Sequence, residues 1–329
     1  MCELHLTSIN ISDAPLAALA AYGLLRIVTE EEVFQDMGAR WYLRWEKNQT
    51  DMDAHAVLIA EKFIDDCADE LVHRLKAFID HRAENPWEIF VPPSYKDEFE
   101  TLIQNGMKKD TNKEAYDKLL ERFNKNAVTL YPLLSLGRWV RQYKKNKDLF
   151  NFNQMLTYTA SINPFNTYKK IIEYLKEKTD HDTAMIKASL VGEPWSFQDI
   201  TSSFRLHKVI IQEDAYMSNE ASKIDAPTEA VGEWLAFEAL PYYASYLTRG
   251  RRNTTMPGLI SYKGNLALRF PLWSASLSYA SVRSLLHLIT VKNISDEMKE
   301  SMGIDGIIEV KQYKVGQGLN GVAMPVYSR

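Results

Sequence analysis

An alanine-rich segment near the N-terminus, Leu16–Val28, constrains the fold more than any other part of the chain. Ser12 and Asp13 are residue types that cap helices, and Pro15 suits a first helical turn, so a helix is predicted to begin here. Glycine inside a helix costs about 1 kcal/mol relative to alanine. The presence of Gly23 therefore predicts that a neighbouring element packs closely against this helix.

Apolar spacing along the rest of the chain alternates between strand-like and helix-like periods. Strands are predicted over Glu3–Ile11, Ala39–Glu46, Phe150–Tyr158, Tyr242–Leu247, Leu259–Tyr262 and Leu266–Trp273. Helices are predicted over Asp53–Arg82, Ser94–Lys108, Asn112–Asn126, Tyr131–Lys147, Pro164–Lys178, Glu229–Leu240 and Leu277–Thr290. This order predicts an α+β fold, with mixed sheet elements from the N- and C-terminal regions around a helical middle portion.

A chain of 329 residues is more often two domains than one. Three parts are expected: an N-terminal α+β part with a long helix (1–93), a mainly helical part (94–180) and a C-terminal α+β part with a basic loop (181–329). The polar stretch Asp214–Pro227 is a candidate linker.

Composition excludes several classes of protein. With 46% hydrophobic and 25% charged residues, the chain is neither intrinsically disordered nor collagen-like. It has no run of about 18 uncharged apolar residues, so no membrane span is expected. The first residues lack the basic and apolar regions of a secretory signal. Two cysteines, Cys2 and Cys67, cannot make a disulfide framework or a four-ligand zinc site, so a cytoplasmic location is expected. Cys67 lies on the apolar stripe of the predicted helix Asp53–Arg82 and is therefore assigned to the core.

Charge is distributed unevenly along the chain. The net charge is −4, but residues 1–100 hold 9 Lys/Arg and 20 Asp/Glu, which leaves 30 and 23 in the remainder. The first part is therefore at −11 and the rest at +7. Such asymmetry indicates a localised electrostatic function, although a charge run is also the ordinary composition of a solvated surface.

Two basic segments concentrate the positive charge and are the candidate nucleic-acid-binding sites. The first contains Arg138, Arg141, Lys144, Lys145 and Lys147, with Trp139 and Tyr143 as candidate stacking residues. On the predicted helix, positions 138, 141 and 145 would share a face. The second lies in the window 239–295, which has no Asp or Glu and whose candidate residues are Arg249, Arg251, Arg252, Asn253, Thr254 and Lys263. Arginine with Asn and Thr on a loop suits phosphate oxygens and base edges, although buried strands also lack acids.

Motifs for catalysis are weak in this sequence. Gly316-Gln-Gly318 is far from a dinucleotide fingerprint, and neither a phosphate loop nor a Gly-x-Ser-x-Gly elbow occurs. Asp180-His181-Asp182 keeps open a metal-dependent nuclease, and a surface turn is the simpler interpretation. His73 and His81 are eight residues apart, too far for an i, i+4 metal pair. We therefore assign no catalytic residue, cofactor or metal ligand.

Short motifs in a shared order resemble a known family. They are Asp13-Ala-Pro15, Leu19–Arg26, Leu156–Phe165, Phe204–His207, Asp214-Ala-Tyr216, Gly232–Pro241, Asn253-Thr-Thr255, Phe270–Trp273, Leu277-Ser278 and Val282–Leu286. Together they resemble the CRISPR-associated large-subunit proteins of type I-G (formerly I-U) surveillance complexes.

The resemblance implies a non-catalytic subunit of an RNA-guided interference complex. Its expected partners are the guide RNA-bound complex subunits, double-stranded target DNA and a separate helicase-nuclease. In such a complex the guide reads sequence, while this subunit would recognise an adjacent motif, help to open the duplex and recruit the nuclease. The cysteine ligands that some large subunits use for zinc are absent, so the resemblance implies no metal. The alternative is a helical adaptor that binds protein without nucleic-acid contact.

Overall fold

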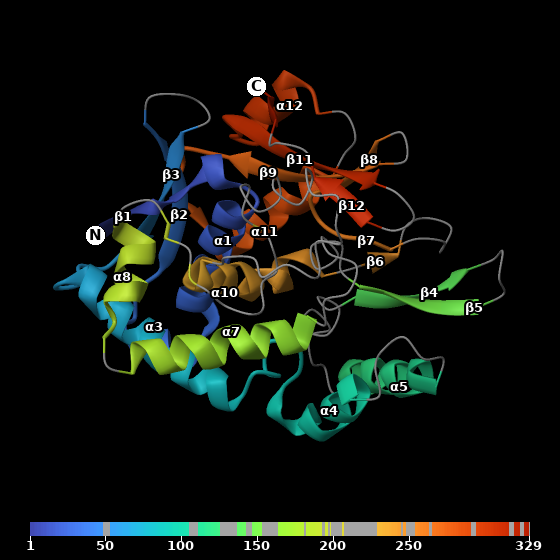
Figure 1. Ribbon diagram of the computed structural model, residues 1–329. Coiled ribbons are helices and arrows are strands. Elements are labelled where there is room, and N and C mark those ends of the chain that lie inside the picture. The colour runs from blue at the N-terminus through green and yellow to red at the C-terminus, as the bar shows by residue number, and fades with distance from the viewer. Residues whose placement is uncertain are drawn as a thin grey trace.

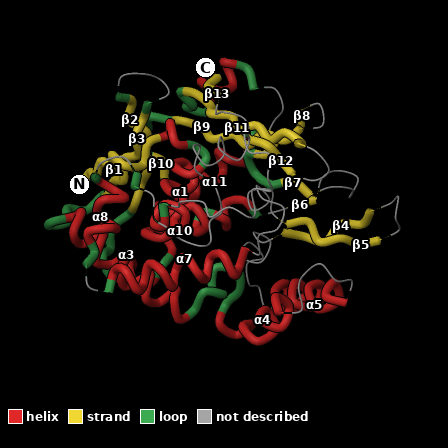
Figure 2. The backbone as a smooth tube through the Cα atoms, viewed as in Figure 1, coloured by secondary structure: helices red, strands yellow, loops and turns green. Residues whose placement is uncertain are grey.

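The computed structural model of the chain contains helices and antiparallel sheets (Figures 1 and 2). It describes residues 1–48, 53–104, 111–125, 137–142, 147–152, 164–180, 182–192, 195–196, 198, 206, 229–244, 246–247, 254–262, 265–290, 294–315, 319–322 and 326–328. The expected α+β class is confirmed, with strands from both ends of the chain and helices between them.

The N-terminal sheet has the strand order β1-β3-β2-β10 and joins distant parts of the chain. Its strands are β1 (Cys2–Asn10), β2 (Trp41–Lys47), β3 (Ala54–Ala60) and β10 (Leu277–Ser278). Every neighbouring pair is antiparallel, so β1 and β2 run parallel to each other with β3 between them. Helix α1 (Leu16–Glu30) connects β1 to β2, which makes this a split β-α-β unit. Short helices η1 (Ile11–Asp13) and α2 (Glu32–Gln35) flank α1.

Side chains of this sheet alternate between two faces. In β2, Trp41, Leu43 and Trp45 are buried, whereas Arg44 and Glu46 are only partly buried. Period-2 alternation puts the first three against the core and the last two on the opposite face. The outer face is therefore where polar groups of neighbouring strands can meet.

Helix α1 packs against α10 (Ala230–Glu238) at the centre of the molecule (Figure 1). Every residue of α1 from Leu16 to Val28 is buried, and so is every residue of α10. A Cβ built at Gly23 would lie 1.7 Å from the carbonyl oxygen of Leu235. The close neighbour predicted from Gly23 is thus confirmed, and it is α10.

The middle of the chain supplies most of the remaining helices. They are α3 (Cys67–Glu84), η2 (Pro93–Tyr95), α4 (Lys96–Gln104), α5 (Thr111–Lys125), α7 (Pro164–Thr179) and α8 (Ala184–Val191). Helix α3 has Asp69 and Glu70 in its first turn and His81 and Arg82 in its last, the charge order that a helix dipole favours. Strands β4 (Gly137–Gln142) and β5 (Lys147–Phe152) form a separate antiparallel pair.

The C-terminal sheet has the order β12-β11-β9-β8, with β13 also pairing with β11. The strands are β8 (Leu259–Tyr262), β9 (Asn265–Leu272), β11 (Gly306–Val315), β12 (Leu319–Val322) and β13 (Val326–Ser328). The short strands β6 (Tyr246–Leu247) and β7 (Thr254–Thr255) pair with each other. Helices η5 (Leu240–Tyr243), α11 (Tyr279–Leu288) and α12 (Asp296–Ser301) complete this region.

Two predicted helices are wrong. The first part of the predicted helix Asp53–Arg82 is strand β3, which is buried at all seven positions. A strand buried on both faces has a continuous apolar run, which periodicity alone cannot distinguish from a helix. The predicted helix Tyr131–Lys147 contains β4 and the start of β5, where Trp139 and Val140 are residue types that favour strands.

Among the described residues, no helix combines the length and the apolar character that crossing a bilayer requires.

Candidate functional site

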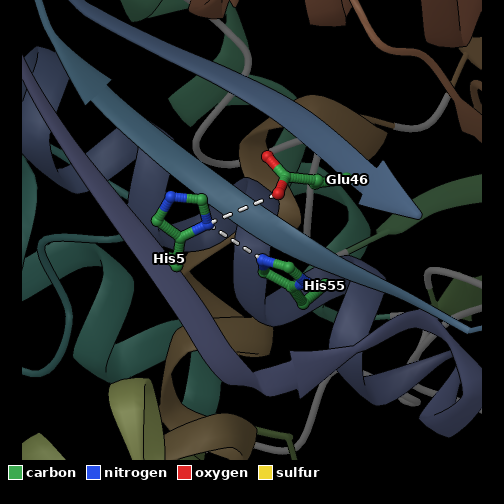
Figure 3. Close-up of side chains that lie close together, drawn as sticks. All are labelled: His5, Glu46 and His55. Carbon is green, nitrogen blue, oxygen red and sulfur yellow. Dashed lines mark hydrogen bonds and ion pairs between the residues drawn. The ribbon is translucent and has the colours of Figure 1, made fainter. Parts of the chain in front are cut away.

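Three ionisable side chains meet on the outer face of the N-terminal sheet (Figure 3). His5 comes from β1, Glu46 from β2 and His55 from β3. His55 pairs directly with Glu46, and His5 pairs with Val57, two residues further along β3 on the same face. The register of three strands therefore brings together residues that are up to 50 positions apart.

The donor atoms of this cluster lie within 4.8 Å of one another. His5 Nδ1 is 3.1 Å from His55 Nε2 and 3.8 Å from Glu46 Oε1. His55 is only 7% exposed, whereas the side chains of His5 and Glu46 are 46% and 41% exposed. The cluster is thus anchored in the sheet at one end and open to solvent at the other.

The orientation of His55 is set by polar groups at the end of the β2–β3 connection. His55 Nδ1 is 3.0 Å from Asn48 Oδ1, and Asn48 Nδ2 donates to Asp53 Oδ1 at 3.0 Å. An amide oxygen only accepts, so in the neutral ring His55 Nδ1 carries the proton and Nε2 carries the lone pair. Burial lowers the pKa of His55, while the negative charge of Glu46 works in the opposite direction.

Arg44 keeps the third member of the cluster ionised. Its guanidinium donates to Glu46 Oε2 at 2.8 Å and to Glu3 Oε2 at 3.0 Å. The hydrogen bond from Arg44 lowers the pKa of Glu46. One carboxylate oxygen of Glu46 is thereby held by Arg44, and the other, Oε1, is directed toward His5.

A second polar cluster lies in the interior, between α1, α3, α7 and α10. Fully buried Glu238 accepts hydrogen bonds from Arg26, Arg82 and the hydroxyl of Tyr168. Glu31 accepts from both arginines at 2.7 Å. Burial opposes charge on Arg26, but Glu238 and Glu31 outweigh it and the pKa of Arg26 is raised.

A cavity of about 640 Å³ borders this interior network, and Arg26, Glu31 and Arg82 are among its lining residues. The network pairs its buried charges with one another, which is what a structural role requires. We therefore regard it as part of the core rather than as the functional site.

The first predicted basic segment lies on hairpin β4–β5. Arg138, Trp139 and Arg141 belong to β4, and Lys147 begins β5. Tyr143, Lys144 and Lys145 lie outside the described residues. The predicted helical face shared by positions 138, 141 and 145 is wrong, because β4 is a strand in which positions 138 and 141 fall on opposite faces.

Of the candidate residues in the second predicted basic segment, the structure describes only Thr254. Thr254 pairs with Leu247 across β6 and β7. Arg249, Arg251, Arg252, Asn253 and Lys263 lie outside the described residues, as does the linker candidate Asp214–Pro227.

The two carboxylates of the candidate nuclease motif Asp180-His181-Asp182 have structural partners. Asp180 forms an ion pair with Lys76, and Asp182 accepts a hydrogen bond from the backbone N–H of Ala184 at the start of α8. His181 lies outside the described residues. Cys67 is buried as predicted, and burial raises the pKa of its thiol to about 12.

Sequence reasoning missed His5, Glu46 and His55. The expected helix over Asp53–Arg82 placed His55 outside any sheet, so it had no register with Glu46. The alternation around His5 and Glu46 predicted two strands, but the continuous apolar run that follows His55 gave no signal that separates a strand from a helix.

No family model, curated protein or solved structure matches this chain.

Proposed function

We propose that this chain is a non-catalytic subunit of an RNA-guided type I CRISPR interference complex. In this role it contacts target duplex DNA, takes part in adjacent-motif recognition and strand opening, and helps to recruit the helicase-nuclease. The order of the short sequence motifs supports the family, and the geometry of hairpin β4–β5 supports nucleic-acid contact.

Hairpin β4–β5 carries the observation on which the proposal rests. Arg141 pairs with Asp148, Trp139 with Phe150 and Gln142 with Lys147. In a strand, positions 139 and 141 fall on one face and position 138 on the other. Cations are therefore distributed over both faces of a two-stranded ribbon, with Lys144 and Lys145 in the sequence that joins its strands.

A two-stranded ribbon is one of the elements that a major groove accommodates. Figure 1 draws β4 and β5 extending away from the sheets at the right of the view. Positive charge along such a ribbon would contact phosphates, and an aromatic residue such as Trp139 would stack on an unpaired base.

The second basic segment has a similar topology. Because β6 pairs with β7, the chain between Leu247 and Thr254 connects two antiparallel strands. That connection contains Arg249, Arg251 and Arg252. Both basic segments thus join or form paired strands, and their arginines are of the residue type that contacts phosphates.

The test uses the complex purified through a tag on this chain from its native cell. Its RNA is sequenced, and its binding to target duplex is measured over a salt series. The variant is Arg138→Ala/Arg141→Ala, and the control is Lys118→Ala/Lys125→Ala, which removes two lysines paired to acids on α5. Each lost phosphate contact reduces the slope of log K against log salt by about 0.9, so the arginine variant loses affinity and slope while the control keeps both.

Two results would overturn the proposal. A chain that elutes without guide RNA and without other complex subunits does not belong to such a complex, and the adaptor alternative then takes its place. A complex whose affinity and salt slope are unchanged in Arg138→Ala/Arg141→Ala does not use this hairpin for DNA.

A further inference from the structure

We propose that His5, Glu46 and His55 form a binding site for a divalent first-row transition metal ion of the zinc type, with a fourth position open to water. The site ties together strands β1, β2 and β3 of the N-terminal sheet. It does not depend on the function proposed above.

Two of the three separations are close to those between ligands of one ion, and all three ligand atoms lie within 4.8 Å of one another. Zinc binds imidazole nitrogen at about 2.0–2.1 Å and carboxylate oxygen at about 2.0–2.2 Å, so two ligand atoms of a tetrahedral site are about 3.4 Å apart. The separations from His5 Nδ1 are 3.1 Å to His55 Nε2 and 3.8 Å to Glu46 Oε1, one on each side of that value. Small rotations of exposed side chains would equalise them.

One ring nitrogen of each histidine is available at the centre of the cluster. Asn48 fixes the tautomer in which His55 Nε2 is unprotonated, and that nitrogen faces His5 Nδ1. Without an ion, the short contact requires a proton on His5 Nδ1. A metal ion replaces that proton, because the neutral imidazole of His5 can carry its proton on Nε2 instead.

Neighbouring residues are arranged as the outer partners of metal ligands usually are. A ligating histidine commonly donates its second N–H to an oxygen that is itself held in place. His55 does so to Asn48, and Asn48 is held by Asp53, which also accepts from Asn10. The ligand carboxylate of Glu46 is likewise oriented by Arg44 through its other oxygen.

The ligand set selects the class of ion. Two imidazoles and one carboxylate suit zinc and its first-row neighbours, whereas magnesium and calcium prefer oxygen ligands throughout. Exposure of His5 and Glu46 provides an entry path and room for a water molecule as the fourth ligand. Three protein ligands on three strands would also stabilise the folded sheet, because the unfolded chain does not hold them together.

The experiment uses the untagged full chain, freed of metal with a chelator and then titrated with zinc chloride by calorimetry. Thermal unfolding is followed with and without zinc, and cobalt(II) serves as a visible-absorption probe of the coordination. We expect one equivalent of zinc to bind with micromolar or tighter affinity and to raise the unfolding temperature. Magnesium chloride at the same concentration should have no effect.

The variants are chosen at the exposed end of the cluster so that the fold is retained. His5→Ala and Glu46→Gln each remove one ligand and should weaken zinc binding at least tenfold, with loss of the cobalt absorption and of the thermal shift. His73→Ala removes an exposed histidine of α3 and should bind zinc like the wild type. Asn48→Ala, which frees the His55 ring, should weaken binding less than loss of a ligand does.

The proposal is overturned if the wild-type chain shows no saturable binding at micromolar zinc. It is equally overturned if His5→Ala and Glu46→Gln bind zinc as tightly as His73→Ala, since the ion would then occupy another place.

Discussion

Gly23 of α1 lies directly against the backbone of Leu235 in α10, where a Cβ would come within 1.7 Å of the carbonyl oxygen and 3.1 Å of the Ala239 nitrogen. The obstacle is backbone rather than a flexible side chain, so it cannot move aside. The two helices that form the centre of the core therefore touch main chain to main chain.

Gly23→Ala is expected to destabilise the protein severely. Alanine would gain about 1 kcal/mol in helix propensity, but forcing the helices apart costs about 3 kcal/mol or more because the surrounding core is close-packed. Denaturant unfolding gives the free energy. Gly303→Ala is the control, since nothing lies within 4 Å of its Cβ position and only its positive φ opposes the change. Equal losses in the two variants would contradict the close packing of α1 on α10.

Glu238→Gln is expected to lower the free energy of unfolding by about 3–5 kcal/mol, the cost of breaking a buried ion pair from one side. The substitution leaves Arg26 and Arg82 buried with Glu31 as their main counter-charge. Urea unfolding at neutral pH measures the loss. Lys118→Ala, which breaks an exposed pair on α5, should leave stability unchanged. A Glu238→Gln protein as stable as wild type would mean that the network contributes nothing to the fold.

Glu229→Gln is expected to change how stability depends on pH. Burial raises the pKa of Glu229 to about 7, against hydrogen bonds from Ser189 and the Gly232 N–H. As pH rises from about 4.5 to 7, the unfolded chain loses this proton while the folded protein keeps it, so the carboxyl makes folding progressively less favourable. The shift corresponds to about 3 kcal/mol.

Unfolding free energies at pH 5 and pH 8 test this pH dependence. Glutamine cannot ionise, so relative to wild type the variant should gain about 2.5 kcal/mol of stability between the two values, because part of the effect is already present at pH 5. Glu173→Gln, at a side chain that is 56% exposed on α7, should show no such gain. A constant difference between Glu229→Gln and wild type at both pH values would refute a raised pKa.

Strong periodicity made several elements predictable from the sequence. Helices α1, α7 and α10 and strands β1, β2 and β9 lie close to where apolar spacing, caps and breakers placed them. Each has one clear pattern, because only one face is buried or because Gly or Pro marks an end.

Strand β3, and the site that strand register assembles, were not predictable in this way. Strand β3 looks like part of a helix because none of its positions is exposed. Because the sequence predicted β3 as part of a helix, it did not pair His55 with Glu46 or bring it close to His5. A site made of single residues from three strands leaves no contiguous motif, and only the pairing of the strands brings its members together.

The complete burial of α1 also has a consequence for protein synthesis. The helix ends at Glu30, while the helix that covers it begins at Ala230. Translation adds about 5–20 residues per second, so the apolar surface of α1 emerges from the ribosome about 10–40 seconds before α10 has been made. During that interval the face of α1 that α10 covers has no native partner, and chaperones that bind during translation are expected to protect it.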